Sequence, residues 1–77
     1  MKSVKIRFKS IKEISNFVQI VSNENIHAEI NSRNTTVNAK TFLGILAMDL
    51  TVPLTLMIFE EDERAQAVLS KISSYID

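Results

Sequence analysis

VNAKTFLGILAMDL, residues 37–50, is the stretch that decides the fold, because a short β-type run changes here into a brief apolar helix. Thr41 directly precedes the apolar run, where a threonine hydroxyl can accept a hydrogen bond from a free backbone N–H one turn later. We therefore predict that Thr41 is the N-cap of a helix. Gly44 is the only glycine in the chain, and it predicts that this helix packs closely against its neighbour.

Upstream of this stretch, two patterns predict a strand and then a helix. Apolar and polar residues alternate over residues 2–8, which is the period of a half-buried strand. Ser10 and Glu13 form an S-x-x-E capping box, in which the two side chains satisfy free amides at a helix start. The helix that follows should end near residues 22–23. Its apolar stripe consists of Ile11, Ile14, Phe17, Val18 and Val21.

The remaining segments predict three strands and a final helix. Residues 26–31 alternate as a strand, and residues 32–34 have the composition of a turn into a strand at 35–38. Pro53 suits the first position of a strand through residue 58, because proline has no N–H to donate. Acidic residues 60–63 favour a helix start. The stripe that predicts a helix to the C-terminus consists of Ala65, Val68, Leu69, Ile72 and Ile76.

The order strand, helix, strand, strand, short helix, strand, helix predicts an α+β fold. Each element has one apolar face, so the economical arrangement is a four-stranded antiparallel sheet with three helices on one face. The other sheet face is expected to be solvated. This suits its polar residues, which are Lys5, Arg7, Glu29 and Thr55. The chain has no internal linker or repeat, so residues 1–77 are predicted to form a single domain.

Composition excludes several function classes. Nine basic and nine acidic residues balance, which disfavours binding to nucleic acid or an anionic membrane. The chain has no cysteine and only one histidine, so neither a disulfide framework nor a structural zinc is expected. No apolar run approaches the roughly 20 residues of a membrane span. We predict a cytoplasmic protein that has no cofactor.

His27 is the first candidate for proton or phosphoryl transfer, because its unperturbed pKa lies near neutrality. It falls within a predicted strand on the polar face, and no motif gives it a carboxylate or basic partner, so a site role is not favoured. The acidic residues 60–63 lack the alternating oxygen pattern and the glycine of a calcium loop. We predict no catalytic residue and no metal ligand.

The two predicted helix starts are weaker candidates for binding sites. Ser10 has no glycine elbow or neighbouring base, so we interpret it as a cap and not a nucleophile. Lys12 favours an anion at that helix start, whereas Glu13 opposes one. A phosphate on Thr41 would be electrostatically favourable at a helix N-terminus, although capping alone explains this residue.

The short helix after Thr41 has more apolar residues than one buried face can use. Phe42, Leu43 and Leu46 cannot all face the core, so some of them are expected to form a docking surface. The alternative is that they only close the end of the core.

The quoted stretch resembles the regulatory-site segment of HPr, the histidine-containing phosphocarrier protein of the sugar phosphotransferase system, where family members have V-N-x-K-S-I-M-G-x-M-x-L. The predicted element order is also that of the HPr fold, a βαββαβα open-faced β-sandwich. Family members carry a phosphoryl group on a histidine within G-I-H-A-R-P-A at the start of the first helix. By this resemblance, Ser10, Lys12 and Glu13 stand where the family has the histidine, the arginine and the proline, which implies a degenerate phosphocarrier site.

The resemblance places Thr41 at the family's regulatory serine and makes it a candidate for regulatory phosphorylation. It places Phe42 and Leu43 at the apolar docking pair, with Leu46 beside them. It therefore implies a divergent HPr-like protein that is not an enzyme and that binds partners of the phosphotransferase or catabolite-control type. Two alternatives remain, namely a working phosphocarrier that uses another acceptor such as His27, or a structural or oligomerisation domain. The expected state is a monomer or a weak homodimer.

Overall fold

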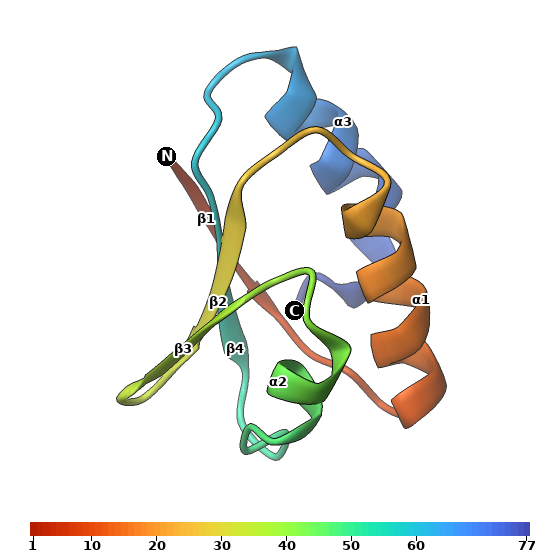
Figure 1. Cartoon of the computed structure of the whole chain (residues 1–77), viewed down its shortest axis with the longest axis vertical. Helices are drawn as coiled ribbons and strands as arrows, with labels where there is room; N and C mark the ends of the chain where they lie inside the picture. The colour runs from red at the N-terminus through yellow and green to blue at the C-terminus, as the bar shows by residue number, and fades with distance from the viewer.

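The computed structural model describes residues 1–77 and contains one four-stranded sheet with helices packed on one face (Figure 1). The strands are β1 (Lys2–Ile6), β2 (Ala28–Ser32), β3 (Thr35–Asn38) and β4 (Leu54–Ile58). The helices are α1 (Ile11–Ser22), α2 (Phe42–Leu46), α3 (Glu63–Lys71) and the 3-10 turn η1 (Ser73–Tyr75). The strand order is β1-β4-β2-β3, and every neighbouring pair is antiparallel. The predicted fold class is confirmed.

The core lies between the sheet and the helices because each inner strand alternates in burial. In β4, for example, Leu54, Leu56 and Ile58 are fully buried, whereas the residues between them are half-buried. Seventeen apolar residues form one buried cluster, which includes most of the predicted helical stripes. The opposite sheet face is open and polar, and there Lys5 Nζ donates a hydrogen bond to Thr55 Oγ1 at 2.8 Å. The expectation of a solvated outer face is therefore confirmed.

β1 is shorter than predicted and ends at Ile6 instead of Phe8. The Arg7 N–H leaves the sheet and donates to the Tyr75 carbonyl at 2.9 Å. Phe8 is nevertheless buried, and its ring packs edge-on against Phe17 with centroids 5.1 Å apart. The alternating pattern thus predicted the burial of Phe8 correctly, although it did not predict where strand pairing stops.

The predicted C-terminal helix is too long, because α3 ends at Lys71 and the chain then turns back toward β1. Ile76 forms an isolated antiparallel bridge with Ile6, and the Asp77 N–H donates to the Lys5 carbonyl at 2.9 Å. The outer side of β1 has free backbone groups, and pairing with them competes with further helix at this point. Ile76 is consequently 39% exposed and does not continue the apolar stripe of α3.

The hairpin between β2 and β3 is tighter than predicted. Ser32 pairs with Thr35 as the last rung of the ladder, so the turn contains only Arg33 and Asn34. Arg33 has a φ of 57°, in the left-handed region that few residues other than glycine adopt readily. The chain then enters α2, which lies at the same end of the molecule as the beginning of α1 (Figure 1).

Candidate functional site

The beginning of α1 is closed by two local hydrogen bonds. Ser10 is the N-cap, and its Oγ accepts a hydrogen bond from the Glu13 N–H at 3.2 Å. The Glu13 carboxylate accepts one from the Lys9 N–H at 2.7 Å, one residue before the amide that a standard capping box uses. The predicted cap is present, and it places the negative charge of Glu13 at the helix start. Lys12 is exposed beside it.

Ile11 is a correction to the predicted core of α1. The spacing of apolar residues predicts that Ile11 belongs to the apolar stripe of this helix, but the residue is 60% exposed. Ile14, Phe17 and Val21 are the buried members of that stripe. The exposed Ile11 adds an apolar group to the beginning of α1, where the sequence alone predicted only polar site residues.

Thr41 occupies the N-cap position of α2, as predicted, but its hydroxyl makes no capping hydrogen bond. The backbone alone begins the helix, because the Thr41 carbonyl accepts from the Ile45 N–H at 3.2 Å. The Thr41 methyl group lies over Gly44, 3.1 Å from where a β-carbon on that glycine would be. Gly44 is the third helical residue, whose amide a capping hydroxyl would bind. Because the methyl group packs over this residue, the exposed hydroxyl is left out of the cap.

The three predicted docking residues of α2 differ in exposure. Leu43 is 72% exposed, which is the highest value among the large apolar side chains of the chain. Phe42 and Leu46 are only half-buried, and both pack against the core cluster. Ile45 is fully buried and anchors the helix. The apolar residues of α2 therefore do both things that the sequence suggested as alternatives. Phe42 and Leu46 help to close the core, and Leu43 is exposed at the surface.

Helices α1 and α2 are in contact, and α2 lies beside the end where α1 begins (Figure 1). Together they form what we call the α1–α2 surface. It consists of Ser10, Ile11, Lys12, Phe42, Leu43 and Leu46. The surface presents two exposed aliphatic side chains, a hydroxyl and a lysine, without a nucleophile paired with a base. This arrangement suits recognition of another macromolecule better than bond chemistry.

His27 lies away from this surface. It directly precedes β2 instead of lying within a strand, and β2 begins at the end of the molecule opposite α2 (Figure 1). Its ring stacks on Phe59 with centroids 4.5 Å apart, and its Nε2 lies 3.1 Å from Glu29 Oε2. The sequence did not predict this carboxylate partner, which becomes adjacent because positions 27 and 29 share the outer face.

The acidic side chains in residues 60–63 bind different partners and do not form one cluster. The Glu60 carboxylate accepts from the His27 N–H at 3.0 and 3.1 Å, and Glu61 pairs with the N-terminal amine at 3.0 Å. Asp62 caps α3, where hydrogen bonds from Arg64 lower the pKa of this carboxyl and raise the pKa of the guanidinium. The run is therefore a helix start with dispersed contacts, and no three acidic or histidine side chains converge.

None of the helices combines the length and apolar character that a membrane crossing requires. No protein-family model matches the sequence, and no curated protein matches it either. Among solved structures, the fold is that of the HPr-like proteins. This comparison confirms the expected HPr-like architecture.

Three solved structures illustrate the likeness. The phosphocarrier protein HPr of Bacillus anthracis superposes with a TM-score of 0.71 at 24% identity, over 99% of this chain and 94% of that one. HPr-C-His of Thermoanaerobacter tengcongensis gives a TM-score of 0.71 at 28% identity, over 96% and 93%. Crh, the catabolite repression protein of Bacillus subtilis, gives 0.66 at 24% identity, over 94% and 82%, and was solved as a domain-swapped, intertwined dimer.

Proposed function

We propose that this chain is a divergent HPr-like protein without a phosphocarrier histidine, and that it binds protein partners of the phosphotransferase system or of carbon catabolite control. The observation that carries the proposal is the 72% exposure of Leu43 on α2, at the position that resembles the family's apolar docking pair. The half-buried Phe42 precedes Leu43 on α2, and the exposed Ile11 lies on the contacting helix α1. Clustered exposed apolar side chains with a polar rim mark interaction surfaces.

The proposal excludes phosphate transfer through histidine because the required group is missing from the beginning of α1. The only histidine of the chain is His27, and the N-cap of α1 is a serine. A serine hydroxyl cannot form the labile phosphoimidazole that onward transfer needs. Glu13 holds a carboxylate at the same helix start, and its charge would repel a phosphate there. The α1–α2 surface is then a docking surface that has no carrier chemistry.

Replacing Leu43 tests the docking proposal. The partners to use are two enzymes that bind HPr, the first enzyme of the phosphotransferase system and the kinase of the regulatory serine. Leu43→Glu should abolish binding, because it places a charge in the apolar centre of the contact. Ala67→Glu, on the exposed side of α3, is the matched control and should bind as the wild type does. Equal binding by both variants would show that α2 is not the docking surface.

The rival hypothesis is a working phosphocarrier that uses His27. It predicts that the protein gains acid-labile phosphate from phosphoenolpyruvate and the first enzyme, and that His27→Gln removes this label. The geometry argues against it, since the Glu29 carboxylate lies 3.1 Å from His27 Nε2 and would repel a phosphate on the ring. Phosphate found on His27 would replace the docking proposal with this one.

Phosphorylation of Thr41 is an optional extension of the proposal. Its exposed hydroxyl takes no part in the cap of α2, so a kinase can modify it without breaking that helix start. A phosphate would add about −1.5 to −2 charges next to Leu43 and so alter docking. Incubation with the kinase and ATP should add one phosphate, detected by mass. Thr41→Val keeps the methyl group over Gly44 and should remain unmodified, whereas phosphate on that variant would exclude Thr41 as the acceptor.

Self-association is the second alternative for the α1–α2 surface. Exposed Leu43 would then be covered by another copy, and light scattering would detect a dimer that Leu43→Glu dissociates. We expect a monomer or a weak homodimer at micromolar concentration. A stable dimer that persists in Leu43→Glu would instead place any self-interface elsewhere on the chain.

A further inference from the structure

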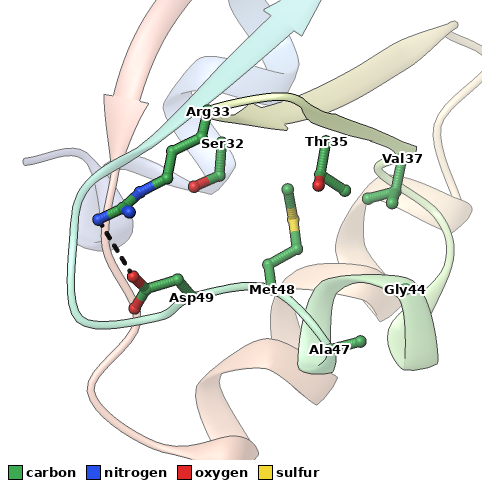
Figure 2. A pocket seen from close by; sticks show the side chains of 8 residues that line it. All are labelled: Ser32, Arg33, Thr35, Val37, Gly44, Ala47, Met48 and Asp49. Carbon is green, nitrogen blue, oxygen red and sulfur yellow. Dashed lines mark ion pairs between the residues drawn. The ribbon is translucent and has the colours of Figure 1, made fainter.

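A pocket of about 290 Å³ opens between the β2–β3 hairpin and the end of α2 (Figure 2). The hairpin contributes Ser32, Thr35 and Val37, and the opposite wall contains Gly44 and Met48. Val37 and Met48 are hydrophobic lining residues on opposite walls of this space. The volume is at the lower end of the range of small-molecule sites, which begins at roughly 300 Å³. The pocket is large enough for a metabolite and too small for a helix or a strand of a partner.

Ser32 and Thr35 bring two hydroxyl groups to the pocket. Ser32 is the only polar residue of the chain that is buried, with 8% of its surface exposed. None of the hydrogen bonds within the chain uses its hydroxyl, which points into the pocket in Figure 2. The Thr35 hydroxyl points into the same space (Figure 2). Both hydroxyls are accessible to solvent, because no side-chain polar atom of the chain is both buried and without a partner. They are therefore free to bind the polar end of a ligand.

An ion pair spans the mouth of the pocket. Arg33 Nη2 lies 3.4 Å from Asp49 Oδ2, and the two side chains are 71% and 40% exposed. Hydrogen bonds from the Thr51 hydroxyl and N–H hold Asp49 in place and lower the pKa of its carboxyl, with Arg33 adding to the effect. Exposed pairs of this kind are weak, so a ligand can insert between the two groups at little cost. The mouth therefore offers one fixed anion and one cation side by side.

The paired charges at the mouth select the class of ligand. A ligand with only a carboxylate would be attracted by Arg33 but repelled by Asp49. A ligand with only an amine would be attracted by Asp49 but repelled by Arg33. A ligand that has both groups avoids either repulsion. We propose that the pocket binds a free α-amino acid with an apolar side chain of about the size of leucine or methionine. Its carboxylate binds Arg33 and Ser32, its ammonium group binds Asp49, and its side chain packs against Val37 and Met48.

This proposal is independent of the docking function, because none of the groups that bind the amino acid belongs to the α1–α2 surface. The test uses backbone amide NMR titrations of the wild-type protein. The probes are L-leucine, L-methionine, isocaproate as the carboxylate alone and isoamylamine as the amine alone. Saturable shifts confined to residues 32–37 and 44–51 are expected for the two amino acids, with affinities at least tenfold above those of the other probes. No saturation, or equal affinity for isocaproate, would overturn the proposal.

Two variants extend the test to the polar groups. Ser32→Ala should bind leucine about three- to tenfold more weakly, because one hydrogen bond to the ligand is lost. Ser70→Ala, an exposed serine on α3, is the matched control and should bind as the wild type does. Asp49→Asn should bind leucine and isocaproate with equal affinity, because the carboxylate that binds the ammonium group is removed. Unchanged leucine binding by Ser32→Ala, or a preference for leucine that survives in Asp49→Asn, would refute the assigned contacts.

Discussion

Replacing Gly44 with alanine should stabilise the protein more when residue 41 is serine than when it is the natural threonine. A glycine within a helix costs roughly 0.5–1 kcal/mol relative to alanine, so the substitution should gain that amount if the site has room. The new β-carbon would lie 3.1 Å from the Thr41 methyl group and 3.4 Å from the nearest atoms of Val37. The Val37 contacts are ordinary van der Waals contacts. The Thr41 contact is too short and requires the methyl group to move.

Moving the Thr41 side chain away from its rotamer costs about 0.5–1.5 kcal/mol. In the natural sequence this cost offsets the gain, so the net effect of Gly44→Ala on the free energy of unfolding should lie between about 0.5 kcal/mol stabilising and about 1 kcal/mol destabilising. In a Thr41→Ser background the obstructing methyl group is absent. There, Gly44→Ala should stabilise the protein by about 0.5–1 kcal/mol. The coupling between the two positions then equals the cost of moving the methyl group, about 0.5–1.5 kcal/mol.

Urea unfolding followed by circular dichroism measures all four members of this double-mutant cycle. A difference of 1 kcal/mol also shifts the melting temperature of a domain of this size by about 4–8 °C, which gives an independent check. If Gly44→Ala has the same effect in both backgrounds, the methyl group does not pack over the glycine, and the reason given for the missing cap is wrong.

Three further predictions address the core, the first cap and acid stability. Ile45→Ala should lower the free energy of unfolding by about 2–5 kcal/mol, since this fully buried side chain anchors α2, and a cost below 1 kcal/mol in urea unfolding would contradict its role. Glu13→Ala should lower the free energy of unfolding by about 1 kcal/mol in the same assay, because the Lys9 amide loses its acceptor. An unchanged midpoint of urea unfolding would show that this hydrogen bond does not stabilise the protein. The pKa of Asp62 is lowered from 3.8 by Arg64, so its charge adds stability above pH 3.8 that is lost as the pH falls through the folded-state pKa. The stability difference between the wild type and Asp62→Asn, which keeps a capping side chain, should therefore shrink on acidification, and a constant difference would contradict this.

The fold was predictable because local patterns and global packing agree in this chain. Strand alternation, the Ser10 cap and the apolar helix stripes all specify the same two-layer arrangement. The strand order β1-β4-β2-β3 was not predicted, because burying one face of each element does not specify which strands are neighbours. The predictions of element ends were wrong where a contact between distant residues sets the end of the element. α3 stops at Lys71 because the last residues pair with the free side of β1, and no local signal in the sequence encodes that pairing.

The site was predictable only in part, because exposure depends on neighbours that a pattern does not show. Ile11 fits the spacing of the α1 stripe, but it lies farther from the centre of that stripe than the half-buried Val18 when residues are placed every 100°. A helical projection could therefore have identified it. The missing hydroxyl bond of Thr41 depends on a rotamer, which the sequence does not specify. The pocket was not predicted at all, since it forms between the β2–β3 hairpin and residues after α2.

A competition assay tests the central claim most directly. A phosphocarrier HPr is modified in two reactions, by the first enzyme with phosphoenolpyruvate and by the kinase with ATP, in the presence of excess amounts of this protein. We predict that the protein slows at least one reaction, that Leu43→Glu slows neither, and that the protein itself gains no acid-labile phosphate. Acid-labile phosphate on the protein, or no competition in either reaction, would contradict the claim that this fold retains docking without histidine chemistry.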